Sequence, residues 1–222
     1  MKLNKYIDHT LLKPTATNDA IVALCNEAKS HHFFSVCVNS CYVALAKAQL
    51  INSEVKVCSV IGFPLGAMNT KGKVEETKQA LLDGADEIDM VINVGFLKSK
   101  DFDYVYKDIE AVKKAMPSNT LKVILETCYL DDSEIIKASE LAINSGADYI
   151  KTSTGFGTGG ATIHDVELMK STISTCGTKI KASGGIRDTK TALEYINLGV
   201  ERIGTSNGIA IVTGANSEDN NY

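Results

Sequence analysis

Short hydrophobic runs rich in β-branched residues recur along the chain, and segments with helical periodicity lie between most of them. The eight runs are Ile7–Thr10, Phe33–Val38, Val55–Ile61, Glu87–Val94, Leu121–Thr127, Tyr149–Thr152, Lys179–Ser183 and Arg202–Thr205. Their length and composition predict β-strands. Apolar residues between Phe102 and Met116 step by three and four, which is typical of an amphipathic helix. Ser133, Thr162 and Asp188 each precede a helical pattern and are predicted N-caps.

The alternation of strands and helices predicts a parallel sheet with crossover helices. Eight such strands would close a (β/α)8 TIM barrel, and the 222 residues lie near the lower size limit of that fold, which is about 200 residues. An open doubly wound α/β sheet is the alternative. That fold usually carries a GxGxxG or P-loop motif after its first strand, and neither is found there. We expect one barrel domain over residues 1–213 and a flexible polar tail over residues 214–222.

A repeated phrase also favours the barrel. The segments Gly84–Asp89 (GADEID) and Gly146–Lys151 (GADYIK) match closely, and Gly199–Gly204 (GVERIG) is a looser copy. Each has the pattern of a helix C-cap glycine, a short turn and a strand. Since Asp89 and Lys151 hold the same place in the phrase, we expect them to point into the same space.

The composition narrows the classes of partner. The formal net charge is −4, from 23 Lys and Arg against 27 Asp and Glu, which argues against nucleic acid or an acidic membrane as a partner. No run approaches 18 apolar residues, so no transmembrane helix is expected. The six cysteines are irregularly spaced without a CxxC pair, and the N-terminus lacks a signal-peptide pattern. These features predict free thiols and a cytoplasmic protein, and no residue set has the spacing of a zinc site.

Charged residues interrupt three of the predicted strands. Asp89, Lys151 and Lys181 each lie within an apolar run, where an unpaired charge is costly to bury. Each could instead lie at a strand end and reach water. Barrel active sites lie at the C-terminal ends of the strands, and both lysines are followed closely by loop residues. A second ammonium group favours a free amine on the first lysine, a free amine can form a Schiff base, and a carboxylate can move protons. The set therefore predicts class I aldolase chemistry.

Three glycine-rich turns follow late strands, at residues 152–160, 183–187 and 204–208. Glycines let backbone N–H groups approach an anion, and the last strand ends of such barrels commonly bind phosphate. The alternative is that glycine only permits tight turns. His9 could act as a base, but its place beside Asp8 favours a structural role. Glu126, at the end of its strand, could contact the two lysines.

Several motifs resemble those of the deoxyribose-phosphate aldolase family over nearly the whole chain. They are Tyr6–Lys13 (YIDHTLLK), Val36–Val38 (VCV), Asp86–Val91 (DEIDMV), Leu121–Thr127 (LKVILET), Tyr149–Gly155 (YIKTSTG), Lys181–Arg187 (KASGGIR) and Arg202–Asn207 (RIGTSN). The resemblance implies a TIM barrel without metal or cofactor. It implies reversible cleavage of 2-deoxy-D-ribose 5-phosphate to D-glyceraldehyde 3-phosphate and acetaldehyde in deoxynucleoside catabolism.

The resemblance also implies roles for individual residues. Lys151 would form the Schiff base, Lys181 would tune it, and Asp89 would transfer protons together with water. The residues that would bind substrate and its phosphate are Asp8, Thr10, Cys37, Thr154, Gly155, Gly184, Gly185, Ser206 and Asn207. Some relatives have a phosphate-binding lysine where this chain has Phe156, and some end in a tyrosine that relays protons, as Tyr222 could here.

Two other functions fit a charged barrel site. A sugar-phosphate isomerase would use Asp89 as a base and form no covalent adduct, and a sugar-phosphate sensor would bind without turnover. Neither needs two lysines beside one pocket, which favours the aldolase. We expect a small-molecule substrate and a homo-oligomer, with a dimer as the first expectation.

Overall fold

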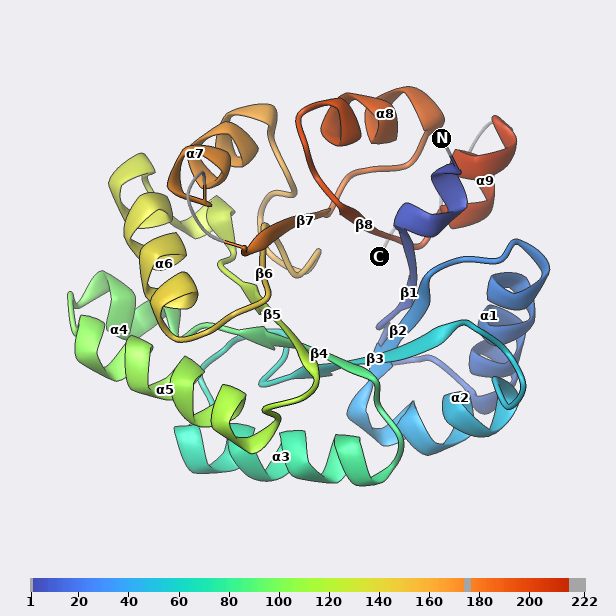
Figure 1. Ribbon diagram of the computed structural model, residues 1–222, viewed down its shortest axis with the longest axis horizontal. Helices are drawn as coiled ribbons and strands as arrows, with labels where there is room; N and C mark the ends of the chain where they lie inside the picture. Colours follow the sequence, from blue (N-terminus) through green and yellow to red (C-terminus); the bar gives the residue numbers. More distant parts are fainter. Residues whose placement is uncertain (1, 174–176, 216–222) are drawn as a thin grey trace.

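Eight parallel strands form a closed barrel in the computed structural model, which describes residues 2–173 and 177–215 (Figure 1). The strands are β1 (Ile7–Leu11), β2 (Ser35–Asn39), β3 (Lys56–Ile61), β4 (Glu87–Val91), β5 (Thr120–Ile124), β6 (Tyr149–Lys151), β7 (Lys179–Ser183) and β8 (Arg202–Thr205). Neighbours in the sequence are neighbours in the barrel, and β1 pairs with β8. The (β/α)8 prediction is confirmed, and the open sheet is excluded.

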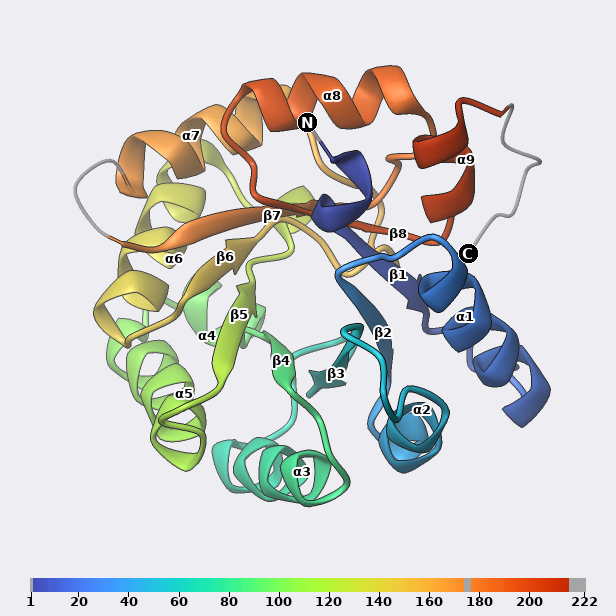
Figure 2. The same ribbon diagram turned by 45° about the vertical axis from the view of Figure 1, so that its right-hand side comes forward.

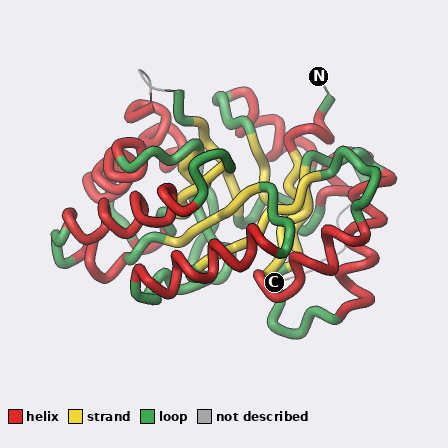
Figure 3. The backbone as a smooth tube through the Cα atoms, turned by 60° about the horizontal axis from the view of Figure 1, so that its bottom comes forward, coloured by secondary structure: helices red, strands yellow, loops and turns green. Residues whose placement is uncertain are grey.

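Helices surround the barrel on the outside (Figures 1 and 3). They are α1 (Asn18–Ser30), α2 (Val43–Gln49), α3 (Thr70–Leu82), α4 (Val94–Lys98), α5 (Phe102–Ala115), α6 (Asp132–Asn144), α7 (Ile163–Ile173), α8 (Thr189–Asn197) and α9 (Gly208–Thr213). The short α9 packs against β1 and against the 3₁₀ turn Leu3–Tyr6 that precedes β1 (Figure 2). Within the described ranges, no helix is long and apolar enough to cross a membrane.

Two predicted strands are shorter than expected because side chains and backbone turns end them. The strand predicted to reach Val94 ends at Val91, since the Asn93 side chain accepts a hydrogen bond from the Phe96 N–H and caps α4. The strand predicted to reach Thr127 ends at Ile124, because Glu126 adopts the left-handed conformation with φ of 57°. Each deviation brings a polar side chain to the C-terminal end of the barrel.

The helix starts agree with the prediction at two of three positions. Thr162 accepts a hydrogen bond from the Asp165 N–H, and Asp188 caps α8 by accepting one from the Thr191 N–H. The prediction of Ser133 as a cap was wrong. Asp131 caps α6 in a capping box with Glu134, because the Asp131 carboxylate accepts from the Glu134 N–H and the Glu134 carboxylate accepts from the Asp131 N–H. The Ser133 hydroxyl instead donates to Asp131.

Successive side chains of a strand alternate between the barrel interior and the helices. In β1, Asp8 faces the charged interior, whereas the His9 Nε2 atom lies 2.7 Å from Glu27 Oε2 on α1. The His9 side chain therefore points away from the barrel interior and pairs with Glu27, as expected for a structural role. Apolar residues at the outward positions join the inner faces of the helices in one large core.

Candidate active site

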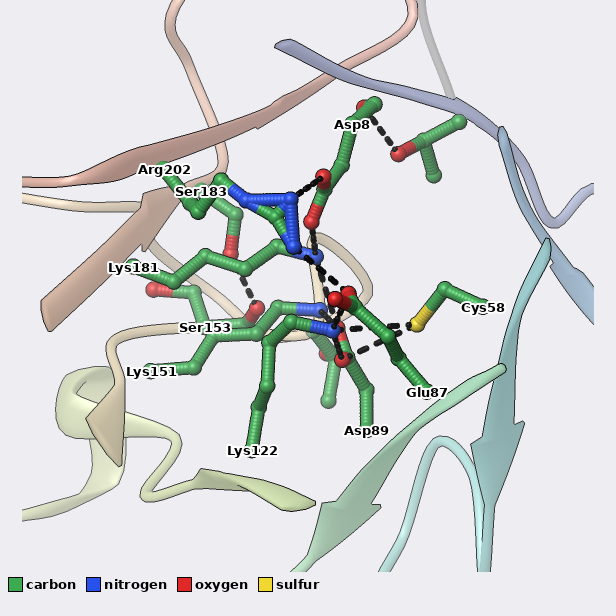
Figure 4. Close-up of polar contacts among 12 residues, drawn as sticks. Asp8, Cys58, Glu87, Asp89, Lys122, Lys151, Ser153, Lys181, Ser183 and Arg202 are labelled. Carbon is green, nitrogen blue, oxygen red and sulfur yellow. Dashed lines mark hydrogen bonds and ion pairs between the residues drawn. The ribbon is translucent and has the colours of Figure 1, made fainter. Parts of the chain in front are cut away.

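Seven charged side chains occupy the interior of the barrel, and each is at most 3% exposed. They are Asp8, Glu87, Asp89, Lys122, Lys151, Lys181 and Arg202 (Figure 4). Four are cationic and three are carboxylates, so these buried groups carry one more positive than negative charge when all are ionised.

Asp89 lies at the centre of the network. Its Oδ2 atom accepts hydrogen bonds of 2.8 Å from both Lys151 and Lys181, and its Oδ1 atom accepts one of 2.8 Å from Lys122. The expectation that Asp89 and Lys151 share one space is confirmed. Burial raises the pKa of Asp89, but the ammonium groups of the three lysines outweigh burial and hold that pKa well below its usual value. Asp89 is therefore a carboxylate that orients the lysines.

The lysines differ in their partners. Lys181 Nζ lies 2.6 Å from Asp8 Oδ2 and 2.8 Å from Asp89 Oδ2. Burial lowers the pKa of Lys181, but the two carboxylates outweigh it and raise that pKa above the usual value. In the described ranges, Lys151 has the single carboxylate partner Asp89, and it is 3% exposed at the C-terminal end of β6, whereas Lys181 is fully buried. Lys151 is therefore the more accessible of these two lysines.

Three members of the network were missed by the sequence reasoning. Lys122 lies between Glu87 Oε2, at 2.7 Å, and Asp89 Oδ1, at 2.8 Å. Arg202 lies 2.6 Å from Glu87 and 3.1 Å from Asp8. The signal that singled out Asp89 applies equally to Lys122, a charge in the middle of the apolar run LKVILET.

Two cysteines line the side of the interior opposite the lysine strands. Cys37 and Cys58 are buried with Leu12 and Val60 in a small apolar cluster, and the Cys58 thiol donates to Asp89 Oδ1 over 3.1 Å. The two sulfurs and a carboxylate oxygen of Asp89 lie within 4.8 Å of one another. Three ammonium groups already surround that carboxylate, so the local charge opposes a resident cation.

Thr10, on β1, donates its hydroxyl to the Asp8 carbonyl.

A cavity of about 310 Å³ lies among the glycine-rich turns after β6 and β7. Its lining includes Gly155, Gly184, Gly185 and Arg187. The first three have φ of 88°, 85° and 82°, which glycine adopts without strain. These turns bring backbone groups to one concave surface, as an oxyanion site requires.

Ser206 and Asn207 do not line this glycine-rich cavity. Ser206 lines a separate cavity of about 290 Å³ beside β1 and α1, and its hydroxyl donates to the Asn207 side chain over 2.9 Å. The structure thus brings the turns after β6 and β7 together, and places the turn after β8 on a neighbouring cavity. Tyr222 lies outside the described residues.

Glu126 holds the turn that follows Lys151. Its carboxylate accepts hydrogen bonds from the Thr154 N–H, at 2.9 Å, and from the Thr154 hydroxyl. The hydrogen bonds of Glu126 therefore go to this turn, and the expected contact with the lysines is replaced by support of the loop. The Phe156 ring meets Phe63 edge-on, with 5.3 Å between ring centroids, so an aromatic contact stands where some relatives have a lysine.

Comparison with known proteins agrees with this geometry. The DeoC/LacD family aldolase model matches residues 2–213. A deoxyribose-phosphate aldolase of Finegoldia magna is 58% identical over 214 residues, covering 96% of this chain and all of that protein. One of Brevibacillus brevis is 54% identical over the full length of both chains. The tetrameric deoxyribose phosphate aldolase of Aeropyrum pernix is 34% identical, with a TM-score of 0.89, covering 96% of this chain and 90% of that one. The chain belongs to the DeoC/LacD aldolase family.

Proposed function

We propose that this protein is a class I aldolase that reversibly cleaves 2-deoxy-D-ribose 5-phosphate to D-glyceraldehyde 3-phosphate and acetaldehyde. The observation that carries the proposal is the convergence of Lys151 and Lys181 on one oxygen of Asp89 inside a closed barrel. An isomerase that works by enolisation, or a sensor, would not need this pair of lysines. The names of the relatives also favour the aldolase.

Lys151 is the nucleophile in this proposal. Its amine attacks the aldehyde carbon of the open-chain sugar, and loss of water gives an imine. The protonated imine withdraws electrons, so the C2–C3 bond breaks while the proton of the 3-hydroxyl group leaves. Glyceraldehyde 3-phosphate departs, the remaining enamine is protonated at carbon, and hydrolysis releases acetaldehyde and regenerates Lys151.

Lys181 and Asp89 support these steps electrostatically. Lys181 remains an ammonium group because Asp8 and Asp89 flank it, so a positive charge stays on the Asp89 oxygen that also binds Lys151. Asp89 is a weak base while three ammonium groups surround it. Once Lys151 enters the Schiff base, one hydrogen bond to Asp89 is given up, and the carboxylate becomes better able to pass protons through water.

We assign the glycine-rich cavity to the substrate phosphate. Gly155, Gly184 and Gly185 would present backbone donors, and Thr154 would orient the first turn. Ser206 lines the separate cavity beside β1, so Ser206 and Asn207 would contact the substrate from that side. Asp8, Thr10 and Cys37 would contact the sugar, Tyr222 would relay protons, and the backbone at residues 157–161 would stand in for the lysine absent at Phe156.

Borohydride reduction in the presence of acetaldehyde tests the nucleophile. An ethyl group should be fixed on Lys151, as read by intact mass and peptide mapping, and turnover should be lost in Lys151→Met with the circular dichroism spectrum retained. Lys107→Met, at an exposed lysine paired with Asp103, is the matched control and should keep both adduct and turnover. An adduct on Lys181 would reverse the roles of the lysines. Binding of deoxyribose 5-phosphate without any adduct would support an isomerase or a sensor.

We also propose that the protein works in the cytoplasm as a homo-oligomer, with a dimer as the simplest assembly. The support is the absence of a membrane-spanning helix from the described residues and the tetrameric state of the Aeropyrum pernix relative. Light scattering during size-exclusion chromatography would give the subunit number, and a monomer would refute the assembly.

A further inference from the structure

Two cysteine side chains lie side by side on adjacent strands of the barrel. Cys37 on β2 and Cys58 on β3 are register partners, and both are fully buried. Neighbouring strands run about 4.8 Å apart, and a disulfide accepts Cα–Cα distances of about 4.4–6.8 Å. The two sulfurs and an Asp89 oxygen lie within 4.8 Å of one another, so both thiols turn to the same point of the interior. The backbone therefore already has the spacing of a disulfide.

The surroundings make the two thiols chemically unequal. The Cys58 thiol donates to Asp89 Oδ1 over 3.1 Å, and burial, aided by that carboxylate, raises the pKa of Cys58 well above its usual value. The neighbouring Cys58 side chain outweighs burial and lowers the pKa of Cys37, and the positive charges of Lys181 and Lys151 act in the same direction. Cys37 is therefore the more readily ionised of the two thiols, and Cys58 lies beside it as its register partner.

We propose that Cys37 and Cys58 form a reversible intramolecular disulfide when the protein meets a peroxide, and that the disulfide inhibits turnover. The Cys37 thiolate attacks one oxygen of hydrogen peroxide, giving a sulfenic acid and hydroxide. The Cys58 sulfur then attacks the Cys37 sulfur. A disulfide forms, the sulfenic oxygen leaves as water with the Cys58 proton, and the hydroxide takes up the proton that Cys37 had lost. Two thiols are oxidised, and one peroxide is reduced to two waters.

Inhibition follows from the position of Cys58. Its sulfur touches Asp89 Oδ1, and Lys122 Nζ lies 3.4 Å from the same sulfur. A disulfide of about 2.05 Å draws the Cys58 sulfur toward Cys37 and removes its proton. Asp89 then loses one donor from the oxygen that Lys122 holds, and its orientation toward Lys151 is less restrained. The disulfide also reshapes the wall at Cys37, where the proposed substrate binds.

The test compares reduced and peroxide-treated protein in two readouts. Non-reducing peptide mapping should show a cross-link between the peptides that contain Cys37 and Cys58. Turnover should fall about tenfold, as expected for the loss of a hydrogen bond to a charged group, and a dithiol reductant should restore it. Cys58→Ala should lack the cross-link and should show a smaller dithiol-reversible loss, because it can form only the Cys37 sulfenic acid; each protein is compared with its own reduced form.

A second variant separates these thiols from the others. The triple variant Cys41→Ser, Cys128→Ser and Cys176→Ser removes the exposed Cys41, the partly exposed Cys128 and one cysteine outside the described residues. It should respond to peroxide like the parent protein. No cross-link in the parent, a cross-link without loss of turnover, or an equal reversible loss in Cys58→Ala would each overturn the proposal. The effect on turnover rests on the proposed function, but the cross-link does not. If the protein had no aldolase activity, peptide mapping would still show whether the disulfide forms.

Discussion

Replacement of Lys122 by methionine tests whether the buried ion network supports both the fold and the site. Lys122 is fully buried, and its ammonium group bridges Glu87 at 2.7 Å and Asp89 at 2.8 Å. Methionine keeps an unbranched stem of similar length but removes the charge. Removing one partner of a buried ion pair typically costs about 3–5 kcal/mol, because the other charge stays buried.

The network reduces this cost by sharing partners. Without Lys122, Glu87 keeps Arg202 at 2.6 Å, and Asp89 keeps two lysines at 2.8 Å. We therefore expect the free energy of unfolding to fall by about 3 kcal/mol, at the lower end of the range. Urea unfolding at pH 7, followed by far-ultraviolet circular dichroism, measures it, since the chain has no tryptophan to report by fluorescence.

The pH dependence of the free energy of unfolding tests the same network independently. The pKa of Asp89 is lowered in the folded protein, so its ionisation stabilises the fold above the unfolded pKa, near 3.8, and this contribution is lost as pH falls through the lowered value. Lys122 is the leading attractive cause of that lowering. Lys122→Met should therefore raise the folded pKa of Asp89 and move acid unfolding to higher pH.

Two further variants complete the experiment. Lys107→Met removes an exposed ammonium group and should leave the urea midpoint and the acid midpoint almost unchanged. Glu87→Gln added to Lys122→Met removes one of the two carboxylates left with fewer partners and should recover part of the lost stability. A Lys122→Met protein within about 1 kcal/mol of the parent, with the same acid midpoint, would refute the view that this lysine neutralises buried carboxylates.

Two other predictions concern the loops and a helix start. Glu126→Gln weakens the charge-assisted hydrogen bonds to Thr154, so KM for deoxyribose 5-phosphate should rise about tenfold while KM for the unphosphorylated sugar changes little. Equal effects on both sugars would contradict a role through the phosphate turn. Asp188→Ala removes the acceptor for the Thr191 N–H and should lower the free energy of unfolding by about 1 kcal/mol, whereas Asp188→Asn should keep most of the parent's stability. Urea unfolding of both variants measures the difference, and equal stability of the two would contradict the cap.

Much of the fold could be predicted from local pattern. The runs at Lys179–Ser183 and Arg202–Thr205 match their strands without error, and the helix at Phe102–Met116 ends one residue early. Hydrophobic periodicity is a local property, so it survives in a single sequence. The errors occurred where one side chain competes with the pattern, as Asp131 does at the start of α6.

The candidate site could be predicted only in part. Asp89, Lys151 and Lys181 stand out because a charge in an apolar strand needs a partner wherever that strand is buried. The same rule would have found Lys122. The sequence contains no comparable signal for which oxygen of Asp89 each lysine meets, or for the pairing of Glu126 with Thr154.

The sequence alone therefore determined the order of strands and helices, the charges at Asp89, Lys151 and Lys181, and the glycine turns, because each depends on residues close together in the chain. The tertiary structure decided how these parts meet. Closure of the barrel brings β1 beside β8, so that Asp8 reaches Lys181 and Arg202. The register of β2 against β3 sets Cys37 beside Cys58. These distances arise from packing between distant segments, and no local periodicity encodes them.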